Sequence, residues 1–359
     1  MYDYLIVGAG LYGVTCANLL SERGFRCVVI DKRPNVGGNC HTEERDGIMM
    51  HMHGPHIFHT SDEEVWAFVN RYAHLAPFRY SPVAVYQGHT YSLPVNMWTF
   101  SNVYGVTRPD QVQRFIPAIE DPKNLEDQAI SMVGREVYDR LIYGYTRKQW
   151  NAEPKDLPAS IIKRLPVRYT YDDNYFTDRW QGIPTVGYTE MIRRMIMGVD
   201  VITDQPYDRS MRKMAREVIY TGTIDGYFGN RLGALGYRSL EFVHSKEDTE
   251  NYQGTAVMNY TDSSVSYTRI IEHRHFSATS SPVTWVTTEY PQDHTPENEP
   301  YYPVNNESNS ALHHKYTHLA ANERGVHFGG RLGSYRYMNM DTTIRQAMDF
   351  CRNITHRKP

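Results

Sequence analysis

The stretch from Tyr4 to Asp31 constrains the fold of this chain more than any other. An apolar run, three closely spaced glycines, a helical stretch and a second apolar run follow one another in it. The glycines are Gly8, Gly10 and Gly13. In nucleotide-binding units they permit a tight turn, a close approach of backbone N–H groups to a pyrophosphate, and close packing of the helix. The order of these parts predicts a Rossmann-like dinucleotide-binding unit in an α/β fold, rather than a glycine-rich turn in an ordinary sheet.

The residues after the second apolar run indicate which dinucleotide binds. Asp31 ends that run, where a carboxylate accepts hydrogen bonds from a ribose diol and repels a 2′-phosphate. Lys32 follows, and Gly37-Gly38-Asn39 then forms a second turn suited to close approach. NAD domains do not need a glycine turn at this place. A longer dinucleotide that crosses a second loop fits better, so we expect FAD.

Composition narrows the class of protein. The 359 residues are enough for two or three domains. The net charge is −3 and no long Lys/Arg run is present, so we expect neither nucleic acid nor a membrane as a partner. Four cysteines without CxxC spacing predict buried free thiols. The first residues already form a strand, and no apolar stretch approaches the roughly 20 residues of a bilayer span, which predicts a cytoplasmic protein.

The rest of the chain divides into segments by its pattern of apolar, polar and turn-forming residues. We expect a hairpin from Tyr80 to Leu93, helices from Asn96 to about Gln149, an antiparallel meander from Tyr237 to Tyr290, and a polar loop from Pro291 to Ser310. The predicted segments are an FAD-binding domain over 1–76, 198–236 and 319–359, a β-sheet domain over 77–95 and 237–318, a helical domain over 96–160 that a mobile lid follows, and a β-sheet and lid segment over 161–197.

Several segments in one order match a known family. They are Gly37-Gly38-Asn39, His56-Ile57-Phe58-His59-Thr60, Gly144-Tyr145-Thr146-Arg147-Lys148-Gln149-Trp150, Ile161-Ile162-Lys163-Arg164, Asn174-Tyr175-Phe176, Tyr267-Thr268-Arg269-Ile270-Ile271-Glu272-His273, Pro300-Tyr301-Tyr302-Pro303-Val304-Asn305 and Phe328-Gly329-Gly330-Arg331-Leu332. The chain resembles bacterial UDP-galactopyranose mutase along essentially its whole length.

The resemblance implies a fold and a reaction. The fold is a Rossmann-like FAD-binding domain with an inserted helical domain and an antiparallel β-sheet domain. The reaction interconverts UDP-galactopyranose and UDP-galactofuranose. Reduced FAD displaces UDP through its N5 and forms a flavin–sugar adduct, which opens, recloses as the other ring and takes UDP back. The family also implies a homodimer and the supply of furanose for a surface glycan.

The same resemblance assigns substrate-binding residues. Arg164 and Arg269 align with two arginines that bind the UDP diphosphate, a task that suits planar guanidinium groups. Tyr145 aligns with the residue that stacks on uracil. The aromatic residues aligned with the rest of the pocket are Trp150, Tyr175, Tyr302 and Tyr337. The family carries the first arginine and the tryptophan on a lid, here about 156–174, whose closure excludes water.

The resemblance and the glycine motif together give the cofactor site. Its predicted members are Gly8, Gly10, Gly13, Asp31, Lys32, Gly38, Asn39, His56, Arg331, Asn339 and Met340. His56 is placed beside the flavin and, with the two arginines, among the catalytic residues. Its neighbours His51, His53 and His59 have a spacing that suits a metal, but no Cys or carboxylate cluster completes a site, so no metal is expected.

Four positions depart from the family pattern and leave the sugar open. Asn339 stands where an acid is usual, Tyr80 replaces a frequent asparagine, Pro55 replaces an alanine and Trp180 replaces a tyrosine. UDP-N-acetylgalactosamine therefore stays possible beside UDP-galactose. Without the resemblance, the FAD unit and mixed sheet are equally typical of an amine-oxidase-like oxidoreductase. A nucleotide-sugar binder without activity is a further alternative.

Overall fold

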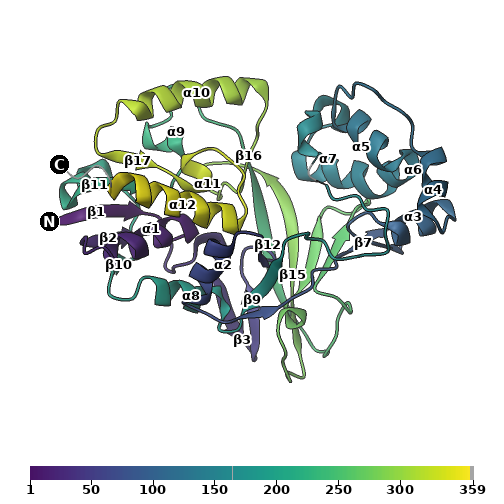
Figure 1. The fold of residues 1–359 in the computed structure, drawn as a ribbon, viewed down its shortest axis with the longest axis horizontal. Helices are drawn as coiled ribbons and strands as arrows, with labels where there is room; N and C mark the ends of the chain where they lie inside the picture. The colour runs from purple at the N-terminus through teal and green to yellow at the C-terminus, as the bar shows by residue number, and fades with distance from the viewer. Residues whose placement is uncertain (164, 356–359) are drawn as a thin grey trace.

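The protein is elongated, with an α/β unit at one end, helices at the other and a large sheet between them (Figure 1). This computed structural model describes residues 1–163 and 165–355 of the 359. Arg164, which the sequence assigns to the diphosphate, lies outside the described residues. Both ends of the described chain belong to the α/β unit (Figure 1).

Within the described residues, the first sheet has five strands, and all neighbours pair in parallel. Across the sheet they are β10 (Asp200–Ile202), β2 (Cys27–Ile30), β1 (Tyr2–Val7), β11 (Ala215–Tyr220) and β17 (Val326–Phe328). The strands come from the three segments that the sequence assigns to the FAD-binding domain.

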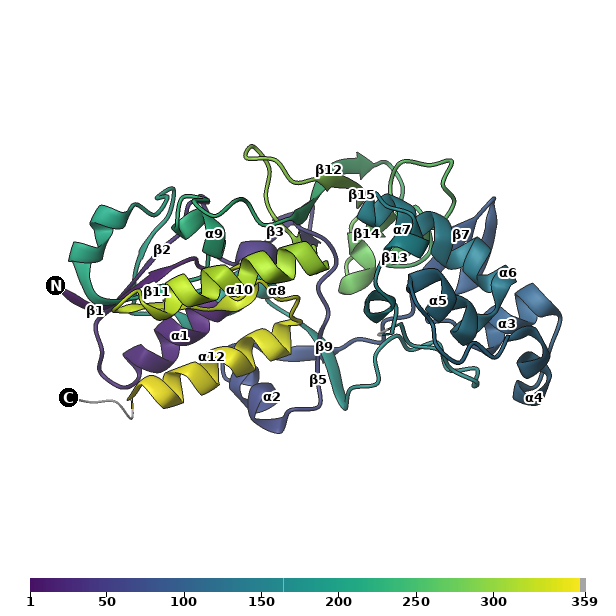
Figure 2. The ribbon, with the colours of Figure 1, turned by 90° about the horizontal axis from the view of Figure 1, so that it is seen from above.

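Both faces of this sheet are buried, as is usual for parallel sheets. Along β1, Tyr4 and Ile6 join one hydrophobic cluster, whereas Leu5 and Val7 join the other. The first face is covered by α1 (Leu11–Ser21), α8 (Gly187–Met195) and α12 (Met340–Thr355). The second is covered by α9 (Ile224–Tyr227) and α10 (Glu307–Ala321). Helices α1 and α12 lie side by side (Figure 2).

The large central sheet has seven strands in the part of the chain described. In order they are β16 (Tyr302–Pro303), β12 (Tyr237–Glu247), β15 (Thr284–Asp293), β14 (Arg269–Glu272), β13 (Val257–Tyr260), β7 (Val83–Tyr86) and β8 (His89–Ser92). The predicted antiparallel pairing is confirmed, with β13, β14 and β15 in meander order, but β12 lies beside β15 rather than β13. The predicted hairpin is β7–β8. Its turn residues Gln87 and Gly88 have φ of 49° and 78°, the left-handed values that tight hairpins need. Only β13 and β7 pair in parallel within this described sheet.

Two small sheets connect these units. One pairs β3 (Thr42–Arg45) with β4 (Ile48–His51), and the other contains β5 (Phe58–Thr60), β9 (Trp180–Pro184) and β6 (Leu75–Pro77). Helix α2 (Glu63–Asn70) follows β5, and the Asp62 side chain caps its N-terminus by accepting from the N–H groups of Glu64 and Val65.

The helical unit has its own core, which explains why it forms a separate lobe. Its members are α3 (Met97–Tyr104), α4 (Pro109–Val112), α5 (Leu125–Val133), α6 (Arg135–Val137), a π-helical turn at Tyr138–Tyr143, and α7 (Gly144–Trp150). Leu125, Ala129, Val133 and Val137 recur at helical spacing, and all four are fully buried in this core.

The predicted polar loop from Pro291 to Ser310 is wrong at both ends. Strand β15 continues to Asp293 and α10 begins at Glu307, with β16 between them. Helix α10 also crosses the predicted domain boundary between residues 318 and 319. Among the described residues of α10, only the Tyr316 side chain is buried. The sequence therefore lacks the apolar stripe by which an amphipathic helix can be predicted.

All four cysteines lie in the described part of the chain, where they are buried and form no disulfide, as predicted. None of the helices described here combines the length and the apolar character that a bilayer span requires.

Candidate functional site

The glycine turn after β1 forms the first wall of the site. Gly8 has φ +107°, and a Cβ on Gly13 would lie 2.0 Å from the Gly8 carbonyl oxygen. This contact keeps α1 directly against the turn. Gly10 and Gly38 pack directly against each other, because a Cβ on Gly38 would lie 3.0 Å from the Gly10 Cα. The two predicted close-approach turns therefore stand opposite each other.

The Asp31 carboxylate orders this turn. It is buried and accepts hydrogen bonds from the backbone N–H groups of Ala9 at 2.7 Å and Arg33 at 2.9 Å. Asp31 thus joins the end of β2 to the glycine turn. This structural role comes in addition to the predicted contact with a ribose. Lys32 is half exposed, and its ammonium lies 2.7 Å from the Glu299 carboxylate.

The structure brings the predicted cofactor residues to a cavity of about 520 Å³. From the predicted set, its walls contain Gly8, Gly10, Gly13, Asp31, Lys32, Gly38, Asn39, His56, Arg331 and Met340. The groove runs past the N-terminus of α1, which is a favourable place for a pyrophosphate. Gly8, Gly10, Gly13, Gly37 and Gly38 line this cavity without side chains, so its walls fit an extended dinucleotide whose pyrophosphate lies close to the backbone.

A second cavity, of about 330 Å³, continues from the first. Asn39, His56, Arg331 and Met340 line both cavities. The other predicted residues in its walls are Tyr145, Tyr175, Arg269, Tyr302, Tyr337 and Asn339. Trp150 lies outside it, in a neighbouring cavity of about 160 Å³ that Tyr302 and Tyr337 also line. The predicted cofactor and substrate residues thus line adjoining spaces.

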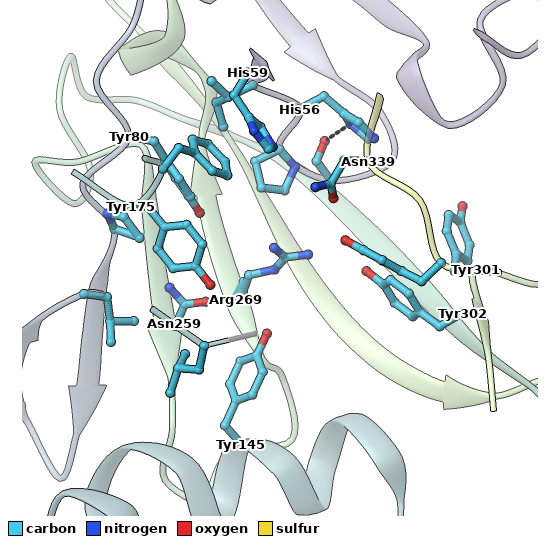
Figure 3. Close-up of a pocket in the computed structure, with 18 of the residues that line it drawn as sticks. His56, His59, Tyr80, Tyr145, Tyr175, Asn259, Arg269, Tyr301, Tyr302 and Asn339 are labelled. Atoms are coloured by element: carbon cyan, nitrogen blue, oxygen red, sulfur yellow. Dashed lines mark hydrogen bonds between the residues drawn. The ribbon is translucent and has the colours of Figure 1, made fainter. Parts of the chain in front are cut away.

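Arg269 occupies the middle of the second cavity (Figure 3). Its Nε donates to Glu289 Oε1 at 2.9 Å and its Nη2 donates to Oε2. Glu289 is fully buried and also accepts from the Thr268 hydroxyl at 3.0 Å. Burial lowers the pKa of Arg269, but the attraction of Glu289 outweighs this effect and the pKa stays above its ordinary value. The guanidinium is permanently charged and held in one orientation.

Aromatic rings surround Arg269. Tyr145 projects from α7 toward it, with Tyr175 on one side and Tyr302 on the other (Figure 3). Tyr302 stacks on Tyr337 with ring centroids 5.9 Å apart, and the Arg331 guanidinium lies over the Tyr337 ring at 4.8 Å. Flat faces beside a fixed cation suit a ligand with a base and a phosphate group.

His56 stands where the two cavities meet. Its Nδ1 lies 2.8 Å from the Gly54 carbonyl oxygen, which can accept only if Nδ1 carries the proton (Figure 3). Burial lowers the pKa of His56 to about 4. The ring is therefore neutral near pH 7, with Nε2 free of a proton. Of the neighbouring histidines, His51 has a structural role, because its Nδ1 accepts a hydrogen bond from the His56 backbone N–H at 3.0 Å.

Residues without a predicted role also line the second cavity. Tyr80 stacks on Phe176 at 5.5 Å, Phe176 stacks on His59 at 3.7 Å, and Asn259 lies beside Tyr175 (Figure 3). Glu289 was missed as well. A single acid in a Thr-rich strand has no partner nearby in the sequence, so no local pattern could reveal its pairing with Arg269.

Comparisons with known proteins agree with this geometry. A family model described as UDP-galactopyranose mutase matches residues 140–337, and one described as an NAD(P)-binding Rossmann-like domain matches residues 6–72. The chain is 40% identical to a probable UDP-galactopyranose mutase of Klebsiella pneumoniae, over 96% of this chain and 93% of that protein. It is 38% identical to a dTDP-fucopyranose mutase of Escherichia coli, over 97% of each.

Solved structures show the same fold. A structure titled as reduced UDP-galactopyranose mutase superposes with a TM-score of 0.76 at 13% identity, over 100% of this chain and 94% of that one. Putrescine oxidase bound to putrescine superposes with a TM-score of 0.56 at 16% identity, over 99% of both chains. The predicted Rossmann-like fold is thus confirmed and is shared with amine-oxidase-like flavoenzymes. The sequence matches over nearly the whole length, however, place this chain in the UDP-galactopyranose mutase family.

Proposed function

We propose that this protein interconverts UDP-galactopyranose and UDP-galactofuranose with FAD as its cofactor. The continuity of the two cavities through Asn39, His56, Arg331 and Met340 supports this proposal most strongly. A dinucleotide that extends past His56 reaches the pocket in which Arg269 and the tyrosines converge. A cofactor in the first cavity and a nucleotide sugar in the second would then lie next to each other.

When bound in the first cavity, FAD in its reduced form would supply the nucleophile, its N5, that displaces UDP from the anomeric carbon. The chain's own residues bind and orient. We assign the diphosphate to Arg269 and Arg164, the base to Tyr145, and the remaining pocket wall to Trp150, Tyr175, Tyr302 and Tyr337. Because Glu289 fixes the Arg269 guanidinium, the positive charge is in place before the diphosphate leaves the sugar.

Two other nucleotide sugars are alternative candidates for the substrate. The relative named dTDP-fucopyranose mutase is nearly as similar as the first, so a thymidine nucleotide of a 6-deoxy sugar is a real alternative. UDP-N-acetylgalactosamine is the other, because Tyr80 and Asn339 depart from the family pattern in the pocket wall. An oxidase remains the alternative of another reaction class, since putrescine oxidase shares the fold.

A turnover assay separates these possibilities. The FAD-loaded protein is incubated without oxygen, with and without dithionite, with the furanose and pyranose forms of UDP-galactose, UDP-N-acetylgalactosamine and dTDP-fucose. We expect isomerisation of UDP-galactose only when the flavin is reduced. Preference for dTDP-fucose would show that the substrate is a thymidine nucleotide sugar rather than UDP-galactose. Substrate-dependent reduction of the flavin without isomerisation would favour the oxidase.

We extend the proposal to the setting of the enzyme: a cytoplasmic homodimer that supplies furanose for a surface glycan. The support is the family membership alone. Light scattering after size exclusion tests the dimer, and a single-chain mass would contradict it.

Tyr145→Ala is expected to weaken UDP binding. Stacking of a base on an aromatic ring contributes about 1–3 kcal/mol, so the Kd for UDP should rise roughly 5- to 150-fold. Tyr145→Phe keeps the ring and should bind UDP nearly as the natural protein does. Titration calorimetry with UDP measures both, and Tyr252→Ala, at an exposed tyrosine, is the control. Equal weakening in the Ala and Phe variants would show that the hydroxyl matters rather than the ring.

A further inference from the structure

Lys148 joins helix α7 to the loop between β13 and β14. Its ammonium lies 2.7 Å from the carbonyl oxygen of Tyr260 and 2.8 Å from those of Asp262 and Tyr267. An ammonium has three N–H donors, and these three carbonyls use all of them. Lys148 therefore has no donor left for a ligand, and it does not line either large cavity.

The three carbonyls lie next to residues that do line the second cavity. Asn259 precedes Tyr260, and Arg269 follows Tyr267 by two positions on β14. On the helix side, Tyr145 lies about one turn before Lys148. One ammonium thus connects the helix that carries Tyr145 with the strands that carry Asn259 and Arg269.

Two further contacts keep the helix against the sheet. A Cβ on Gly144 would lie 2.3 Å from the Thr261 carbonyl oxygen, so the helix backbone rests directly on the loop. At the other end of α7, Arg238 of β12 donates from Nε to the Gln149 carbonyl at 2.9 Å and from Nη2 to the Lys148 carbonyl at 3.4 Å. These are carbonyls of the last helical turn, which a cation satisfies well.

The placement of Lys148 is unusual for a structural lysine. In the described residues it forms no ion pair with a carboxylate. Burial lowers its pKa to about 8. The Asp262 carboxylate attracts this ammonium and raises its pKa in part, but it does not pair with it directly. The three backbone carbonyls therefore supply most of the compensation for the lost water, and they do so only where the loop holds this one shape.

We infer that Lys148 is a positioning residue for the nucleotide pocket, which fixes Tyr145 relative to Arg269 by holding the β13–β14 loop against α7. The inference rests on the proposed function to the extent that the ligand between these two residues is a nucleoside diphosphate. Lys148 acts through its neighbours and contacts neither substrate nor cofactor.

The test replaces Lys148 and measures UDP binding apart from turnover. Lys148→Met keeps the length of the side chain but removes its donors. Because a displacement of about 1 Å in a binding site can cost 100-fold, we expect the Kd for UDP and the KM to rise about 10- to 100-fold, with kcat much less affected. The FAD content should be that of the natural protein, since the cofactor cavity lies elsewhere. Lys315→Met, at an exposed lysine of α10, is the matched control.

Two more variants distinguish positioning from general damage. Lys148→Arg keeps the charge, but its planar donors cannot reach three converging carbonyls, so we expect a smaller rise in Kd than with Met. In the Tyr145→Ala background, Lys148→Met should add little, because its effect passes through that ring.

The outcomes are distinct. An unchanged Kd for UDP in both Lys148 variants, or full additivity with Tyr145→Ala, would overturn the inference and leave the proposed function intact. If the natural protein bound neither UDP nor dTDP, the proposed function would fail and this inference with it.

Discussion

Arg269→Ala should lower turnover by about 100- to 1000-fold, the usual cost of removing a preorganised donor from developing charge. The substitution has a second effect, because Glu289 is fully buried and its carboxylate would lose its cation. Removing one partner of a buried ion pair costs about 3–5 kcal/mol of unfolding free energy. The variant should therefore be both inactive and less stable, as turnover assays and chemical denaturation would show.

A double variant separates the two effects. Arg269→Met together with Glu289→Gln removes both charges, so most of the stability should return while turnover stays low. FAD should remain bound in both proteins, because Arg269 lines only the second cavity. Full turnover in the double variant would remove Arg269 from the reaction. Loss of flavin in both variants would show that our placement of the substrate relative to the cofactor is wrong.

The second large effect is expected at the glycine turn. Gly13→Ala places a methyl group 2.0 Å from the Gly8 carbonyl oxygen, so α1 has to move away from the turn. We expect the purified protein to lack FAD and to unfold at a lower temperature even as apoprotein. Overpacking of this kind typically costs about 1–3 kcal/mol.

Gly10→Ala is the matched comparison. Gly10 has φ −80°, and the nearest atom to an added Cβ is the Gly38 Cα at 3.9 Å, so the apoprotein should keep its stability. The methyl group would add bulk to the wall of the first cavity, where we expect the backbone to approach the pyrophosphate closely, and FAD affinity should fall. Flavin absorbance and thermal unfolding of the apoproteins measure both effects. Normal flavin content in Gly10→Ala would contradict the proposed path of the dinucleotide.

The nucleotide-binding unit could be predicted from the sequence because its signals are local. The glycine spacing of the first turn, Asp31 at the end of a strand and the second turn at Gly37 to Asn39 all lie within the first 39 residues. Their φ values and close approaches are those that the motif requires. The helices around Leu125 to Val137 were predictable for the same reason, since the spacing of their apolar residues is a local pattern in the sequence.

Other features depend on residues far apart in sequence and were not predictable. The Arg269–Glu289 pair forms across β14 and β15, and the three carbonyls around Lys148 are more than 100 positions away from it. Helix α10 was not predicted because it buries a single side chain and so shows no apolar periodicity. A lone acid, a lysine in a helix and an unpatterned polar segment look ordinary until the fold brings their partners together.

The most direct test of the account is to trap the reaction intermediate. The FAD-loaded protein, reduced with dithionite, is mixed with UDP-galactose and cyanoborohydride, and the released flavin is analysed by mass spectrometry. We expect a flavin whose mass has increased by that of the bound hexose, and only unmodified flavin when FAD is kept oxidised. An active, reduced enzyme that yields only unmodified flavin would contradict it.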